Sequence, residues 1–231
     1  SDQLPRFFWL NSSDNYLLQD AAKQIKNTLR SFSYNYSNDN KIVFHIDSST
    51  DWLLISNTIQ TPGLFCTEQL IELCFINKIT LEQQQELVKL AEILKSNNNA
   101  IIIIIYPFKI ESKILKQKWM VNLNNLIDPG AIITLWPLST TDYPKWLSKQ
   151  LQKYRLNFTD NSLFDYFCQK TMCNPSMASQ TMYKLKLQDV TTVNQEILLA
   201  TLAEHANYDT FDLINSYLLG NLKQALIILK I

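Results

Sequence analysis

The run of residues 100–106, which contains five consecutive isoleucines, constrains the fold of this chain more than any other segment. β-Branched side chains favour a strand over a helix. The run shows no alternation of apolar and polar residues, which predicts a strand that is buried on both faces. Strands of this kind occur in parallel sheets covered by helices, so the segment indicates an α/β domain.

Further segments alternate between strand and helix patterns up to about Pro137. Short apolar or β-branched runs predict strands at residues 7–10, 41–47, 69–76 and 131–136. Helical periodicity between them predicts helices at residues 16–29, 51–59, 80–95 and 112–126. Beyond Pro137 only helical patterns follow, at residues 141–154, 160–170, 176–187, 194–206 and 210–218.

We therefore expect an α/β domain at residues 1–139, a small helical domain at 140–208 and the start of a further helical domain at 209–231. The sequence begins at Ser1 without a methionine and ends in an apolar, helix-like run at residues 224–231. From these two features we expect the chain to be a fragment whose third domain is truncated.

The composition is that of an ordinary globular protein, with 46% hydrophobic and 18% charged residues. The formal net charge is zero, unlike that of strongly basic DNA-binding domains. If the protein acts near DNA, we expect its partners to supply much of the phosphate contact. The apolar run at residues 100–106 is far too short to span a membrane, and no signal peptide is visible, so we expect a cytoplasmic protein.

The motifs of nucleotide-hydrolysing enzymes are missing where an α/β domain would carry them. A phosphate loop needs glycines and a lysine after the first strand, whereas this chain has Asn11, Ser12, Ser13 and Asp14 there. The isoleucine strand is followed by Pro107 and Phe108 instead of acidic residues. We therefore expect no ATP hydrolysis and no bound cofactor.

Other kinds of catalytic or metal site also lack a signal. The four cysteines form no CxxC pair, which predicts reduced thiols and no metal site. His45 and His205 lie inside strand and helix patterns, without a Ser or Cys partner in a recognisable arrangement. Structural roles explain both histidines best, and we predict no catalytic residue.

Read in order, the whole chain resembles the delta subunit family of bacterial DNA polymerase III. The resemblance rests on order and spacing over nearly the whole chain, because no single piece is a strong motif. The segments that carry it are residues 7–19 (FFWLNSSDNYLLQ), 61–69 (TPGLFCTEQ), 143–147 (YPKWL), 198–206, 209–213 and 218–226.

The resemblance implies a non-catalytic clamp-loader subunit with a AAA+-like first domain that lacks the phosphate loop. Such subunits bind the sliding clamp, the beta subunit, and stabilise its open ring, while the gamma/tau subunits bind ATP and delta prime completes the loader. The residues that match the clamp-contacting segment are Pro62, Gly63, Leu64 and Phe65. Contacts with primed DNA are expected to be indirect or weak.

The physics of this segment is compatible with a partner contact. Two large apolar side chains directly after Pro62-Gly63 are hard to place in a regular element, and each is worth roughly 1.5–3 kcal/mol when it enters a pocket. Pro62 lowers the entropy lost on presenting them. The alternative is that Leu64 and Phe65 pack inward. To open a ring, the wider segment at residues 52–67 should also contact the clamp near its ring interface.

Two sets of lysines raise the question of DNA contact. Lys145, Lys149 and Lys153 recur at intervals of four, which places them on one helix face. Lys109, Lys113, Lys116 and Lys118 lie on or near another helix. A solvated surface explains each set most simply, and a weak DNA-tracking role is the functional alternative.

Two hypotheses for the whole chain remain open at the level of the sequence. The first is an interaction subunit of the replication machinery. The second is an unrelated α/β enzyme or small-molecule-binding protein with an unrecognised pocket, for which the sequence offers no candidate residues.

Overall fold

The structure is a computed structural model that describes residues 5–31, 41–61, 69–96, 100–127, 130–172 and 174–203. The chain divides into two compact units, one up to Pro137 and one from Leu138 onward. Each unit has its own hydrophobic core and is described by itself.

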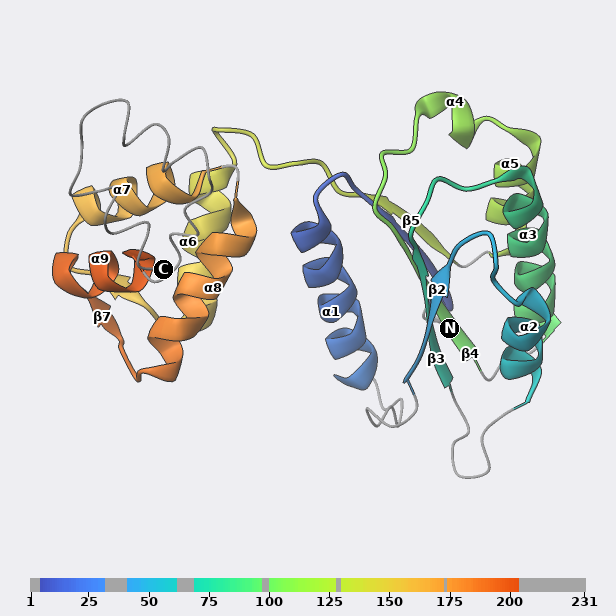
Figure 1. The fold of residues 1–231 in the computed structure, drawn as a ribbon, viewed down its shortest axis with the longest axis horizontal. Helices are drawn as coiled ribbons and strands as arrows, with labels where there is room; N and C mark the ends of the chain where they lie inside the picture. Colours follow the sequence, from blue (N-terminus) through green and yellow to red (C-terminus); the bar gives the residue numbers. More distant parts are fainter. Residues whose placement is uncertain are drawn as a thin grey trace. The chain divides into compact units, whose positions relative to one another are not determined.

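The first unit is built on a five-stranded sheet in which every neighbouring pair of strands is parallel (Figure 1). The strands follow the spatial order β2-β3-β4-β1-β5. Their bounds are β1 Phe7–Asn11, β2 Lys41–Ile46, β3 Gln69–Phe75, β4 Ala100–Tyr106 and β5 Ala131–Thr134. The isoleucine run is the central strand β4, and all seven of its residues are buried. The predicted parallel α/β fold is confirmed.

Helices cover both faces of this sheet, and the side chains of β4 divide between them. Figure 1 shows α1 on one face and α2, α3 and α5 on the other. Ile101, Ile103 and Ile105 belong to the core beneath α1, whereas Ile102 and Ile104 belong to the core beneath the other helices. The helix bounds are α1 Asn15–Ser31, α2 Trp52–Gln60, α3 Leu81–Ser96, α4 Ser112–Leu115 and α5 Lys118–Leu126.

The single helix predicted at residues 112–126 is wrong, because the structure has two helices there. Gln117 adopts an extended conformation, with φ −69° and ψ 147°, and starts α5 as its N-cap. The short α4 buries none of its residues, whereas α5 buries Met120 and Leu123. No glycine or proline marks this break, so helical periodicity alone gave no sign of it.

The second unit is helical, as predicted. Its helices are α6 Tyr143–Tyr154, α7 Asn161–Thr171, α8 Pro175–Leu187 and α9 Gln195–Ala203. A short parallel ladder that the sequence did not predict joins β6 Asn157–Phe158 to β7 Thr192–Val193. Inside the unit, the buried Tyr143 hydroxyl donates a hydrogen bond of 2.8 Å to Thr171 Oγ1. The predicted helix at 210–218 and the predicted boundary at 208/209 lie outside the described residues.

Within the described residues, no helix is both long enough and apolar enough to cross a lipid bilayer.

Among the described residues of the first unit, one charged side chain is buried. Glu72, on β3, is only 4% exposed and accepts from two lysines, Lys26 of α1 at 2.5 Å and Lys41 of β2 at 2.7 Å. A buried carboxylate is costly unless it is paired. The two lysines therefore tie α1 and the edge strand β2 to the interior of the sheet.

Replacing Glu72 with Ala should lower the free energy of unfolding by about 2 kcal/mol, because both lysines lose their partner in a partly buried position. The matched control is Glu86→Ala, which removes a 2.6 Å ion pair with the exposed Lys89 and should cost less than about 0.5 kcal/mol. Urea denaturation measures both values. Equal losses in the two variants would contradict a structural role for the buried pair.

Candidate partner-binding surfaces

Helix α2 leads into the connection for which the sequence predicted a partner contact. It begins at Asp51, whose Oδ1 accepts a 3.0 Å hydrogen bond from the backbone N–H of Leu54. The inner side of the helix buries Ile55 and Ile59. Its outer side exposes two leucines at its start, with Leu53 70% and Leu54 54% accessible. These exposed leucines are apolar surface close to the predicted contact segment in sequence.

The predicted clamp-binding residues, Pro62, Gly63, Leu64 and Phe65, lie outside the described residues. The nearest described residues before and after this segment, Thr61 and Gln69, are joined to each other. The side chain of Gln69, at the start of β3, donates a 3.0 Å hydrogen bond to the backbone carbonyl of Thr61, the C-cap of α2. Because Gln69 is buried, this bond fixes both flanks at the edge of the sheet where β3 begins.

A phosphate loop would lie at the opposite end of the strands, directly after β1. Here Asp14 Oδ1 accepts a 3.2 Å hydrogen bond from the backbone N–H of Leu17, in the first turn of α1. The backbone N–H of Asp14 donates in turn to Ser12 Oγ at 3.0 Å. The carboxylate thus uses a helix N-terminal donor that phosphate-binding proteins offer to their ligand. A negative charge at this position opposes the binding of a phosphate.

The lysines predicted to face DNA do share one face of α6. Lys145, Lys149 and Lys153 are all exposed, and the buried residues of the helix lie on its other side. Lys145 makes a 3.9 Å ion pair with Asp142 in which both side chains are largely exposed, so this pair holds the lysine only weakly. Helix α6 contains no acidic residue, which leaves a basic stripe along its outer face.

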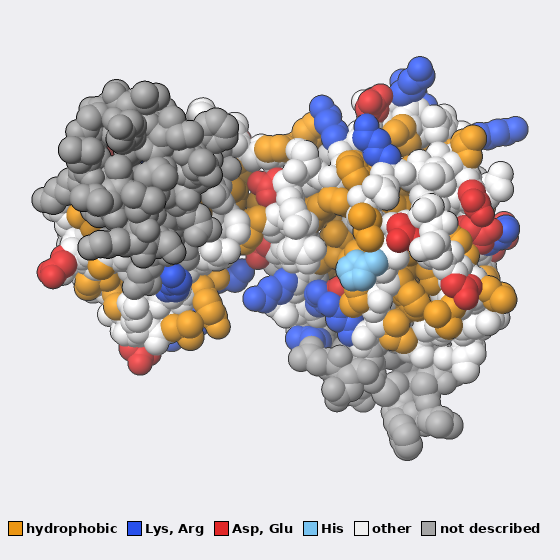
Figure 2. Space-filling model, viewed as in Figure 1, with side chains coloured by type: hydrophobic (Ala, Val, Ile, Leu, Met, Phe, Trp, Pro, Cys, Tyr) orange, Lys and Arg blue, Asp and Glu red, His pale blue; other side chains and the backbone are white. Residues whose placement is uncertain are grey.

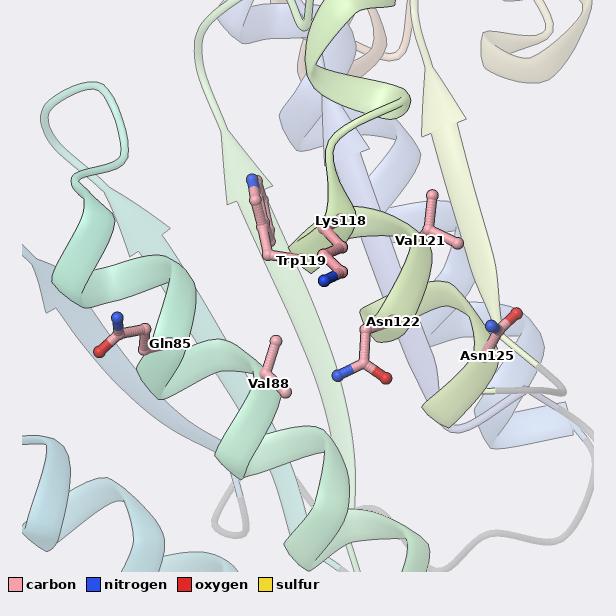
Figure 3. A pocket seen from close by; sticks show the side chains of 7 residues that line it. All are labelled: Gln85, Val88, Lys118, Trp119, Val121, Asn122 and Asn125. Atoms are coloured by element: carbon pink, nitrogen blue, oxygen red, sulfur yellow. The ribbon is translucent and has the colours of Figure 1, made fainter.

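A shallow groove of about 570 Å³ lies between α3 and α5. Val88 of α3 and Asn122 of α5 lie on either side of the gap in Figure 3. Among the described residues that line the groove, Lys118 is the one ionisable side chain. A groove with apolar and amide walls and one lysine lacks the converging titratable groups of an enzyme active site.

Candidate nucleophiles and metal ligands were also located. Burial raises the pKa of the Cys168 thiol to about 11, with a further contribution from Asp165, so this cysteine stays protonated at neutral pH. His45 is exposed on β2, whereas His205 lies outside the described residues. Within the part of the chain that the structure describes, no three His, Cys, Asp or Glu side chains form a group that would hold a metal ion.

Comparison with known proteins decides the family. The model of the family described as "DNA polymerase III, delta subunit" matches residues 13–127, about half of the chain. The chain belongs to the DNA polymerase III delta subunit family. The matched region runs from the start of α1 to the end of α5 and includes the connection between α2 and β3.

Relatives of this delta-family chain agree with the assignment. It is 25% identical to DNA polymerase III subunit delta of Haemophilus influenzae over 98% of its own length. Its fold resembles that of the Bacillus subtilis DNA clamp loader delta protein, with a TM-score of 0.59, 13% identity and 97% of this chain covered. The chain spans 64% of the first relative and 66% of the second, slightly less than two thirds of each.

The sequence also missed one exposed aromatic residue of this delta-family chain. The last strand was predicted to extend to Trp136, but β5 ends at Thr134, and Trp136 is 61% exposed beyond it. A strand-like pattern that runs on into a proline, as in Trp136-Pro137, was the available signal that the strand ends earlier.

Two substitutions separate the effect of the hydrogen bond that Asp14 accepts from the effect of its negative charge. Asp14→Ala should lower the free energy of unfolding by about 1 kcal/mol, because α1 loses the hydrogen bond at its first turn. Asp14→Asn keeps an oxygen acceptor and should cost only a few tenths of that. Thermal or urea unfolding gives both values. If Asn were as destabilising as Ala, the carboxylate would act through its charge on the helix terminus and not through the hydrogen bond.

Proposed function

We propose that this chain is a non-catalytic subunit of the bacterial DNA polymerase III clamp loader that binds the sliding clamp and stabilises its open ring. The observation that carries the proposal is the match to the delta subunit family over residues 13–127, which include the predicted contact segment. Within that segment, Leu64 and Phe65 supply the apolar anchors, and Pro62 and Gly63 present them.

The described flanks support this role in physical terms. A contact segment loses less entropy on binding when its base is already fixed, and the bond between Gln69 and Thr61 fixes that base. Helix α2 contributes further apolar surface at Leu53 and Leu54. Stabilisation of an open ring requires that the clamp bind more tightly when it is open, by an amount that limits the shift. A contact surface broader than one dipeptide serves that requirement.

ATP chemistry is left to other subunits in this proposal, namely gamma/tau, with delta prime completing the loader. The cap that Asp14 forms on α1 supports this division, because it places a carboxylate where a nucleotide phosphate would bind. The alternative of a small-molecule enzyme finds little support in the groove between α3 and α5, which has a single ionisable lining residue.

A second proposal concerns DNA. We infer that Lys145, Lys149 and Lys153 face the phosphate backbone of primed DNA and attract it weakly. Their common exposed face on α6, without an acidic residue in the helix, supports this role. Because the chain carries no net charge and the stripe holds three lysines, the affinity of the stripe for DNA should be low and sensitive to salt.

The clamp proposal predicts that the double variant Leu64→Ala/Phe65→Ala weakens binding to purified sliding clamp at least 100-fold. The reason is the loss of two anchors worth roughly 1.5–3 kcal/mol each. Surface plasmon resonance with immobilised clamp measures the dissociation constant, and circular dichroism checks that the fold persists.

A matched control for this variant is Leu81→Ala. Leu81 is 77% exposed and starts α3, which follows β3 in the chain, whereas the clamp segment precedes β3. It should bind the clamp like the wild type. Wild-type affinity in the Leu64/Phe65 variant would refute the assigned site, and an equal loss in Leu81→Ala would show that exposed apolar residues act non-specifically.

The α6 proposal predicts a change in salt dependence. Replacing Lys145, Lys149 and Lys153 together by Gln should reduce the slope of log affinity against log salt for primed DNA by about 0.9 for each lost phosphate contact. Fluorescence anisotropy at several salt concentrations gives the slope, and Lys95→Gln on α3 is the control for an exposed lysine elsewhere. An unchanged slope in the triple variant would mean that α6 does not contact DNA.

A further inference from the structure

An exposed tryptophan lies at the carboxyl edge of the sheet, which is the end where the parallel strands β1, β4 and β5 finish. Trp136 is 61% accessible, although large aromatic side chains are usually well buried. The backbone before it is anchored, because the N–H of Leu135 donates a 2.9 Å hydrogen bond to the carbonyl of Asn11 on β1. The backbone after it is restricted, because Pro137 disfavours helical conformations at the preceding residue. The indole is therefore exposed to solvent on a conformationally restricted segment.

A lysine is stacked on this indole. Lys109 Nζ lies 5.0 Å from the centroid of the Trp136 ring, which is a cation–π distance. Lys109 follows β4 and Trp136 follows β5, and both strands pair with β1. The order β4-β1-β5 thus brings an exposed ammonium and an exposed indole together at the edge where the three strands end.

The segment that follows Lys109 in the chain is basic. Lys113, Lys116 and Lys118 follow Lys109 within nine residues, Glu111 is the one acidic residue among them, and all are exposed. None of the four lysines forms a salt bridge with another described residue. Figure 2 shows lysine and arginine side chains gathered on the first unit where α4 lies in Figure 1. Positive charge is therefore available to an anionic ligand beside the indole.

We propose that Trp136 and Lys109 form a binding site for single-stranded nucleic acid, in which an unpaired base stacks on the indole. Lys109, Lys113 and Lys116 neutralise the neighbouring phosphates. Proteins that bind single strands without sequence preference combine these two elements, an aromatic platform and basic groups that follow the backbone. An acidic peptide would use the lysines and leave the indole without a function. A duplex keeps its bases stacked on one another and offers no free face to Trp136.

This site is separate from the proposed clamp contact. Trp136 and Lys109 lie at the edge where the parallel strands end, whereas the flanks of the clamp segment, Thr61 and Gln69, lie where β3 begins. The basic stripe of α6 belongs to the second unit, whereas Trp136 and Lys109 belong to the first. Nucleic-acid binding by the chain alone can therefore be tested without a clamp, and its failure would leave the clamp proposal intact.

The test is fluorescence anisotropy of a labelled oligothymidine of about 20 nucleotides at low ionic strength, with the 231-residue chain and its variants. Trp136→Ala should weaken binding about ten-fold, the size of effect expected for one lost base–aromatic stack. Trp136→Phe should retain most of the affinity, because an aromatic ring remains, whereas Trp136→Leu should behave like Ala. Lys109→Gln should reduce the salt slope by about 0.7, as expected for one phosphate contact on a single strand.

Three comparisons make the outcome decisive. Heparin, a polyanion without bases, should bind wild type and Trp136→Ala equally. A duplex of the same length should bind less tightly than the single strand. Lys95→Gln, a variant of an exposed lysine on α3, should leave oligothymidine affinity unchanged. The proposal is overturned if wild type does not bind oligothymidine, if Trp136→Ala binds as well as wild type, or if Phe and Leu at this position are equivalent.

Discussion

The burial of β4 on both faces is the constraint from which the arrangement of the first unit follows. Its isoleucines need apolar cover on two sides, so α1 must lie on one face of the sheet and α2, α3 and α5 on the other. Because neighbouring strands are parallel, all of them begin at one end of the sheet and finish at the other. Thr61 and Gln69, which flank the clamp segment, lie where β3 begins, and the segments after β1, β4 and β5 lie where these strands end. The positions of the candidate surfaces are consequences of this packing.

Much of this was accessible from the sequence, because the signals were local. The isoleucine run predicted the central strand. Helical periodicity predicted helices from residues 51 and 80, where Asp51 and Thr80 accept hydrogen bonds from the backbone N–H groups of Leu54 and Gln83. The break in the helix at residues 112–126 was not accessible. Gln117 is extended, and the helix after it buries Met120 and Leu123, whereas α4 before it packs the partly buried Ile114 against the same core. That difference depends on tertiary contacts, which periodicity along one helix does not encode.

For the candidate surfaces too, some features could be predicted from the sequence and others could not. The shared face of Lys145, Lys149 and Lys153 follows from an interval of four in a helix, and the structure shows all three exposed on α6. The pairing of Lys109 with Trp136 could not be foreseen, because the two residues are 27 positions apart and meet only through the strand order β4-β1-β5. The clamp-binding residues 62–65 came from resemblance to a family and remain a prediction. What the structure adds for them is the anchored base formed by Thr61 and Gln69.

The carboxyl edge of the sheet shows how a fold can keep its topology while its chemistry changes. In parallel α/β proteins, ligands bind at this edge because strand ends and helix N-termini converge there. Here Asp14 satisfies the N-terminus of α1, so the usual attraction for phosphate at that point is lost. Lys109 beside Trp136 restores positive charge at the same edge, outside the helix terminus and next to an exposed ring. This arrangement suits a ligand that has both an unpaired base, to stack on Trp136, and phosphates, to contact Lys109. The missing phosphate loop and the exposed indole therefore share one location in the fold.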